Sequence, residues 1–382
     1  MAKKLVLLTN IIILILFNNN YSQNPVSVPI TNPVYDYLER METLDIVTDL
    51  LDGVRPYSRS RVAEVLVKIN EKRDQLTFID RRKLDEFLLD FRFEINPAEK
   101  HALIPDNITW YSTLASWESF KSDFHRVLDR SYPEEENHVL MWEDSLNTFY
   151  FDFEQSLTFD SRSDGVSRNA NQQKYIFRGQ ISNNFAYQLN ISLQAVRGDA
   201  GYRDLDPIIK NSFIPSTYGD EKAFLDRTGG ELAWHTEFMD IKFAQQEIGW
   251  GHGESGKLIL SNYPEQYPYL QISKCWGWGK FTALHGKLLS YEQDTLSDGT
   301  PLYPDKWVAA QRLEFSPWDP LTIGLNEVFI YGERYADWAY LIPFNFYRAA
   351  QHKLRDRDNA TISLDFEYIP FAGTKLYTTV FL

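Results

Sequence analysis

The feature that most constrains the fold is a two-residue alternation of apolar and polar side chains, which begins near Leu146 and recurs through the rest of the sequence. In "FAYQLNISLQAV" (185–196), apolar residues occupy the odd positions, and amides and hydroxyls separate them from residue 188 onward. Successive side chains of a β-strand point to opposite faces, so this pattern predicts a strand with one apolar and one polar face. The alternation recurs in "LNTFYFDFEQSLTF", in "KYIFRGQIS" and around residues 361–368.

The connections between these predicted strands alternate in length. Short joints are expected at 183–184, near 240, and at 277–280, 317–320 and 370–373, whereas longer ones are expected at 160–173, 197–230, 251–266, 292–304 and 332–358. Outer-membrane β-barrels have this habit, because their turns are short on one side and their loops long on the other. A soluble β-sandwich, the alternative, has no reason to keep the two kinds at opposite ends. We therefore predict an antiparallel outer-membrane β-barrel.

The strand count bears on completeness. About eleven strands are predicted, whereas single-chain bacterial barrels have even numbers. The last, "KLYTTVFL", would leave an unpaired edge, which is not viable in lipid. The expectation is therefore that the sequence is part of a longer barrel, a miscounted strand being the alternative.

The N-terminal part predicts three regions before the barrel. Lys3 and Lys4 precede an apolar run up to Phe17, typical of a secretory signal peptide over residues 1–22. Residues 25–100 have helical periodicity, with N-caps expected at Ser58 or Ser60 and at Thr77 or Asp80. Residues 101–145 are interpreted as a connector of mixed structure, and 146–382 as the transmembrane β-barrel.

Composition narrows the function classes. Aromatic residues make up 15% of the chain, and such rings accumulate at lipid headgroups and on sugar faces. A net charge of −14 argues against a nucleic-acid partner. The single cysteine, Cys275, excludes an internal disulfide and a cysteine-based metal cage. We expect no cofactor.

A glycine-rich segment, "IGWGHGESGKLILSNYPEQYPYLQISKCWGWGKF" (248–281), is the most unusual motif. Aromatic rings beside fixed hydrogen-bonding groups suit sugar rings, whose C–H faces stack while their hydroxyls bond. The alternative is structural, with glycines in tight turns and rings in a membrane-interface belt. The candidate glycan-binding residues of this segment are Trp250, His252, Glu254, Tyr263, Tyr269, Trp276 and Trp278.

Catalytic and metal chemistry are not expected. "GHGESG" matches neither a phosphate loop nor a nucleophile elbow. Glu237, Glu247 and Glu254 offer carboxylates for glycoside hydrolysis, but a polar barrel lumen requires such residues anyway. His235 and His252 are distant in sequence, without Asp or Glu at ligand spacing, so no metal site is predicted.

Three stretches carry a resemblance to a known family. They are "NPVYDYLERMETLDIV" with "RPYSRSRVAEVL", then "GWGHGESGKLILSNYPEQYPYLQIS", then "LEFSPWDPLTIGLNEVFIYG". Together they resemble the capsule-assembly outer-membrane proteins of the Wzi type. The resemblance implies a barrel of about eighteen strands, of which this chain would lack the last third, above a periplasmic helical bundle. It also implies a lectin-like role, attaching or organising capsular polysaccharide or exopolysaccharide at the cell surface.

We therefore predict a non-catalytic outer-membrane protein whose helical domain lies in the periplasm. Its expected partners are capsular or exopolysaccharide, outer-membrane lipid and lipopolysaccharide, with the capsule-export machinery as a further candidate. The segment 332–358 adds cations suited to uronic acids or to lipopolysaccharide phosphates, and further rings; its candidates are Arg334, Trp338, Tyr340 and Arg348. The alternative is a pore for small solutes or sugars, its wet lumen lined by Arg178, Arg312, Glu154 and Glu367.

Overall fold

The computed structural model describes residues 24–48, 50–96, 139–143, 147–182, 184–199, 216–217, 222–253, 256–261, 266–290, 294–295, 297–299, 301–354 and 358–382. The predicted signal peptide and most of the predicted connector lie outside these residues. Within the described ranges, no helix combines the length and apolar character needed to cross a membrane.

The N-terminal residues form a small helical domain. Its helices are α2 (Val34–Thr43), α3 (Arg59–Glu71), the 3-10 turn η1 (Arg73–Gln75), α4 (Phe78–Asp90) and α5 (Arg92–Ile95). Ser58 caps α3 by accepting from the backbone N–H of Arg61 at 3.3 Å, and Thr77 caps α4 by accepting from that of Asp80 at 3.2 Å. Both are among the predicted caps. The apolar stripes of these helices pack into one core that includes Leu38, Met41, Leu66 and Leu84.

The rest of the chain forms one large antiparallel sheet. Neighbours along the sheet follow the order β2-β3-β4-β5-β7-β8-β10-β11-β14-β15-β16-β17, with β6 beside β7. The eleven long strands are those predicted, so the mainly β, antiparallel fold class is confirmed, and among the described residues the sheet runs from β2 to β17 without closing. The strands are β2 (Leu140–Glu143), β3 (Asn147–Ser161), β4 (Ser167–Ile181), β5 (Phe185–Gly198), β6 (Ser216–Thr217), β7 (Lys222–His235), β8 (Asp240–Gln246), β10 (Tyr267–Trp276), β11 (Gly279–Leu288), β14 (Lys306–Trp318), β15 (Leu321–Gly332), β16 (Asn359–Phe371) and β17 (Thr374–Phe381).

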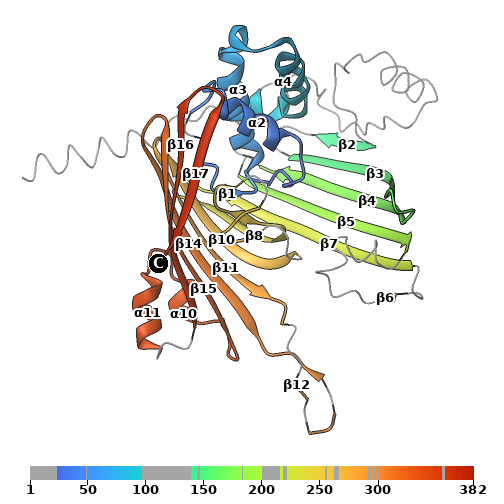
Figure 1. Ribbon diagram of the computed structural model, residues 1–382, viewed down its shortest axis with the longest axis vertical. Coiled ribbons are helices and arrows are strands. Elements are labelled where there is room, and N and C mark those ends of the chain that lie inside the picture. The colour runs from blue at the N-terminus through green and yellow to red at the C-terminus, as the bar shows by residue number, and fades with distance from the viewer. Residues whose placement is uncertain are drawn as a thin grey trace, which may run out of the picture.

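Short and long connections lie at opposite ends of the sheet, as predicted. The helical domain sits at the short-turn end, where the backbone N–H of Gly373 donates to the carbonyl of Thr43 at 2.7 Å (Figure 1). Two short helices, α10 (Trp338–Leu341) and α11 (Tyr347–Lys353), lie at the other end (Figure 1). One predicted long loop, 160–173, is wrong: β3 and β4 extend to Ser161 and from Ser167, because the polar stretch "SRNANQQK" is paired strand.

The two faces of the sheet differ in chemistry. The inner face contacts parts of residues 24–58 and carries buried polar and charged side chains beside an apolar core around Trp250. The outer face carries many exposed apolar side chains. On β5, Gln188 is 7% exposed on the inner face and Leu189 is 39% exposed on the outer face. Other exposed apolar residues of the outer face are Phe153, Leu157, Phe159, Leu193, Phe224, Leu232, Trp234, Phe243, Leu270 and Leu325.

The segment 333–354 folds back on the outer face. The ring of Phe344 stacks on that of Phe281 on β11, with centroids 4.1 Å apart. Gln311 on β14 donates to the carbonyl of Asn345 at 2.8 Å, and the backbone N–H of Tyr347 donates to Glu327 on β15 at 3.1 Å. The predicted long connection is thus present, and it is packed against the wall, where it covers two polar side chains of the outer face.

We predict that Leu189→Arg prevents assembly of the protein into membranes, whereas Asn190→Arg is tolerated. An outward-facing arginine near the bilayer midplane costs about 2–4 kcal/mol, but an inward-facing one meets polar surroundings. Heat-modifiable migration of the membrane fraction on gels measures assembly of each variant. Equal behaviour of the two variants would contradict the assignment of the two faces.

Candidate functional site

The inner face of the sheet is filled by two strands from distant parts of the chain. β1 (Val54–Arg55) pairs with β9 (Gly249–Trp250), and the backbone N–H of Gly251 donates to the carbonyl of Gly53 at 2.8 Å. The ring of Trp250 is completely buried in a core that also holds residues of β10, β11, β14 and β15. The glycine-rich segment is therefore an internal strap beneath the N-terminal domain.

Arg312 on β14 is the centre of a buried charge network. Its guanidinium donates to Asn326 Oδ1 at 2.8 Å and to Asp365 Oδ1 at 3.0 Å, and Glu314 accepts from it at 3.3 Å. Glu314 also accepts from the backbone N–H of Gly53 at 2.9 Å. The network therefore ties the N-terminal part, at Gly53, directly to the wall of the sheet.

Two glycines allow this close approach. A Cβ placed on Gly53 would lie 2.0 Å from Nη2 of Arg312, and one placed on Gly324 would lie 2.5 Å from the same atom. Only a residue without a side chain fits at either position, because the guanidinium is itself held by Asp365.

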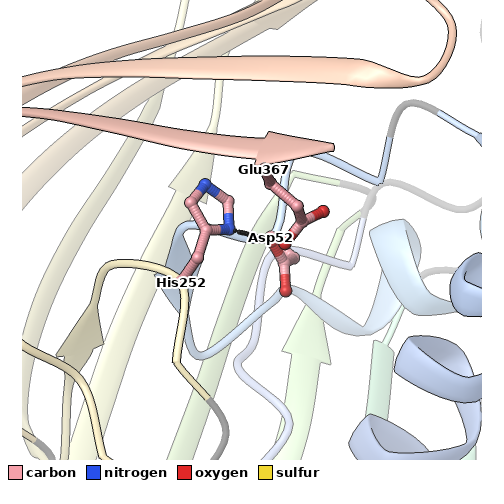
Figure 2. A group of neighbouring side chains, drawn as sticks. All are labelled: Asp52, His252 and Glu367. Carbon is pink, nitrogen blue, oxygen red and sulfur yellow. Dashed lines mark ion pairs between the residues drawn. The ribbon is translucent and has the colours of Figure 1, made fainter. Parts of the chain in front are cut away.

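A second part of the network surrounds His252, which follows the strap strand β9. Its Nδ1 lies 2.9 Å from Asp52 Oδ1 and 2.9 Å from Glu367 Oε2 (Figure 2). Lys375 on β17 lies 2.8 Å from Glu367 Oε2 and donates to Glu42 Oε2 at 2.7 Å. The helical domain, the strap and two strands thus meet at one buried cluster.

Charge shifts the protonation of these groups. Burial alone would lower the pKa of His252, but the carboxylates of Glu367 and Asp52 hold it well above its ordinary value. Burial would likewise raise the pKa of Asp52, but Lys375 and His252 hold it well below its ordinary value. Burial and the neighbouring carboxylates of Glu367 and Asp52 raise the pKa of Glu42. The carboxylates of Asp52 and Glu367 therefore favour a positive charge between them.

This arrangement docks the helical domain and does not line a channel. Of the four residues predicted to line a wet pore, Arg312 and Glu367 are buried and ion-paired. Glu154 is exposed on β3 and pairs with Lys174, while Arg178 lies over the ring of Tyr150. The prediction of a wet lumen is thus wrong at Arg312 and Glu367.

The structure separates the predicted glycan-binding residues. Trp250, His252, Tyr269 and Tyr340 are buried, so their prediction as glycan-contacting residues does not agree with this structure. Glu254 and Tyr263 lie outside the described residues. Trp276 and Trp278 lie at the short-turn end, with the ring of Trp278 60% exposed. At the long-loop end Trp338 is 80% exposed, while Arg334 pairs with Asp358 at 2.7 Å and Arg348 donates to Gln351 at 2.6 Å.

The described carboxylates of the hydrolase alternative do not form a pair. Glu237 lies in the turn before β8, and Glu247 follows the last residue of that strand, where it pairs with Arg227. A seven-residue strand separates them by about 23 Å, well beyond the spacing of either glycosidase mechanism.

Asp52 and Glu367 are functional candidates that the sequence does not reveal. They lie 200 residues before and 115 residues after His252, so only the fold brings them together. Gly53 and its neighbours have the composition of a loop between two helices. The sequence therefore does not indicate that Val54 and Arg55 form a strand that pairs with Gly249 and Trp250.

The chain was compared with known proteins. No family model and no curated protein matches it. Among solved structures it is similar to BamA from Haemophilus ducreyi lacking POTRA domains 1–3, with 9% identity and a TM-score of 0.24, over 64% of this chain and 60% of that one. The match thus spans less than two thirds of the BamA chain. At this TM-score it carries no inference about role, and the fold rests on the strand pairing itself.

We predict that Gly53→Ala loosens the helical domain from the sheet, while Gly277→Ala has little effect. The added methyl at residue 53 collides with a guanidinium that cannot move freely, and such overpacking costs about 1–3 kcal/mol. A methyl at residue 277 meets no atom within 4 Å. Urea unfolding and limited proteolysis of the helical domain measure the difference. Equal midpoints and cleavage rates would contradict the docking role.

Proposed function

We propose that this protein is an outer-membrane β-barrel protein that holds exported polysaccharide at the cell surface and does not transport it through the lumen. The single observation that carries the surface role is the pair of exposed aromatic rings, Tyr335 and Trp338, at the long-loop end. The family resemblance of the sequence supplies the class of ligand.

The outer face of the sheet supports a membrane location. Its exposed apolar side chains would contact lipid, and β3, β4, β5 and β7, with 14 or 15 residues each, exceed the length that a tilted strand needs. Four short turns present an exposed aromatic ring, as expected of an interfacial girdle; these are Phe238, Trp278, Trp318 and Phe371. Trp278 is thereby accounted for without a glycan.

The connection lengths support an orientation. Outer-membrane barrels keep their short turns in the periplasm and their longer loops outside. The helical domain lies at the short-turn end, so it would be periplasmic, and α10 and α11 would lie toward the cell surface (Figure 1).

The long-loop end offers groups suited to an acidic glycan. The ring of Tyr335 is 88% exposed, and that of Trp338 is 80% exposed. The indole N–H of Trp307 donates to the carbonyl of Arg334 at 3.0 Å, which fixes the start of this segment. Such rings stack on the C–H faces of sugars, and the cations Arg348 and Lys353 of the same segment suit uronate carboxylates.

The buried network supports the non-transporting part of the proposal. The strap and residues 50–56 cover the inner face of β8, β10, β11, β14 and β16, and their charges are paired with one another. A solute pathway along these strands would require breaking those pairs.

We predict that the double variant Tyr335→Ala, Trp338→Ala binds the host's own acidic polysaccharide at least ~10-fold more weakly, because loss of anchoring rings at a binding surface costs about 2 kcal/mol or more. The measurement uses fluorescently labelled polysaccharide and the full chain in phosphatidylcholine vesicles, which exclude lipopolysaccharide. Trp278→Ala is the matched control, since it removes an exposed indole from the opposite end. Unchanged affinity in the double variant, or no retention by the parent protein, contradicts the proposal.

We also predict that the parent protein gives no steady conductance in a planar bilayer, because its inner face is occupied. Gly53→Ala is expected to increase the frequency of open events by loosening the strap contact. Stable channels from the parent protein, without retention of polysaccharide, would favour the pore for small solutes and contradict the surface-binding role.

A further inference from the structure

We propose that Asp52, His252 and Glu367 form a binding site for one divalent transition-metal ion of the zinc type, which clasps the helical domain to the sheet. This site is independent of the proposed surface function, since it lies at the inner face and needs no polysaccharide. Its three ligands come from the helical domain's connecting segment, from the strap and from β16 (Figure 2).

The spacing of the three donor atoms fits a metal ion. Nδ1 of His252 lies 2.9 Å from Asp52 Oδ1 and 2.9 Å from Glu367 Oε2, and all three atoms lie within 4.8 Å of one another. A metal bound at 2.0–2.2 Å by nitrogen and carboxylate oxygen places neighbouring donors about 3–3.6 Å apart. The two nitrogen–oxygen distances lie a few tenths of an ångström or less from this range. The two carboxylate oxygens lie within 4.8 Å of each other and would move into the same range on binding.

The same three atoms make no hydrogen bond. Asp52 Oδ1, His252 Nδ1 and Glu367 Oε2 are fully shielded from solvent, and none has the geometry of a donor–acceptor pair. Buried polar atoms without hydrogen bonds are uncommon and costly. Their present contacts are ion pairs only, including that of Glu367 Oε2 with Lys375 at 2.8 Å, and a single cation between them would coordinate all three atoms.

The other atoms of these side chains are positioned as supports. Asp52 Oδ2 accepts from Arg55 at 3.2 Å. His252 Nε2 lies 3.4 Å from Asp365 Oδ1. With Nδ1 on a metal, the proton of the neutral ring sits on Nε2 and points to Asp365, which is the usual carboxylate–histidine–metal arrangement.

Positive side chains also face the cluster and compete with a metal. Lys375 lies 2.8 Å from Glu367 Oε2, and Arg312 Nη2 lies 3.1 Å from His252 Nε2. Lys375 keeps a partner if it leaves Glu367, because it donates to Glu42 at 2.7 Å. Arg312 likewise retains Asp365 and Glu314. The competing cations thus have other carboxylates available.

The donor set indicates the class of metal. Imidazole nitrogen and carboxylate oxygen are both ligand types that zinc takes, and three protein ligands leave a fourth position for water. Calcium takes six to eight oxygen ligands, more than the described residues supply here, so it fits less well. Cobalt(II) binds similar sites and has a visible spectrum that reports its ligands.

The test uses the full chain in detergent, first stripped with EDTA and then titrated with Zn²⁺ or Co²⁺. Bound metal is measured by mass spectrometry, coordination by the Co²⁺ absorption spectrum, and stability by the thermal midpoint. Glu367→Gln and His252→Asn remove ligands with little change of shape, and Asp365→Asn alters a support. His235→Asn is the control, because His235 pairs with Asp240 outside the cluster.

We expect one metal ion per chain, a Co²⁺ spectrum of a nitrogen- and oxygen-ligated site, and a higher thermal midpoint with Zn²⁺ than with EDTA. Glu367→Gln and His252→Asn should lose the bound ion, Asp365→Asn should weaken binding about 10–100-fold, and His235→Asn should bind as the parent does. A parent protein that binds no Zn²⁺ or Co²⁺ and shows no shift in midpoint overturns the proposal. So does a folded Glu367→Gln variant that binds as tightly as the parent. Should the ligand variants not fold, the parent's metal content and Co²⁺ spectrum still decide.

Discussion

The ion pair between Arg312 and Asp365, buried within the wall of the sheet, is the interaction on which the interior arrangement depends. A buried charge left without its partner typically costs about 3–5 kcal/mol, so each member of this network holds the others in place. The backbone of Gly53 lies against the guanidinium of Arg312, and its N–H donates to Glu314 at 2.9 Å. The helical domain is thereby positioned by electrostatics at its tip, while its own apolar core folds separately around Leu38 and Leu66.

The large sheet reverses the usual distribution of polarity, with charged groups inside and apolar groups outside. Gln188 and Leu189 are neighbours in sequence, yet the first is buried at the inner face and the second is exposed. In water such an outer face would be a liability for association, whereas in lipid it is the stable choice. Two polar residues of the outer face, Gln311 and Glu327, are covered by the segment carrying α10 and α11.

The sequence predicts elements whose pattern lies within one short segment. It does not predict contacts between residues that are far apart in the chain. Alternation along β5 and helical spacing from α2 to α4 predict the elements, and Ser58 and Thr77 are capped as expected because capping is local chemistry. Trp250 and Tyr340 look like surface rings for glycan, yet both are buried. Trp250 is covered by Val54, about 200 residues away, and Tyr340 packs on Phe329 and Tyr331 of the neighbouring strand. The cluster around His252 is hidden for the same reason, since its carboxylates lie on other elements.

The strap gives the glycine-rich segment a physical rationale. It leaves the sheet at the long-loop end after β8, turns inward, and pairs through Gly249 and Trp250 with Val54 and Arg55 of the N-terminal part. Gly251 has a positive φ of 106°, a conformation that side chains disfavour, and this bend carries His252 to Asp52 and Glu367. This inward turn therefore links the N-terminal part, through Asp52, to strand β16 near the C-terminus, through Glu367. Because the buried charge network occupies the inner face beside the strap, the exposed rings Tyr335 and Trp338 at the long-loop end remain as the surface on which the proposed polysaccharide binding depends.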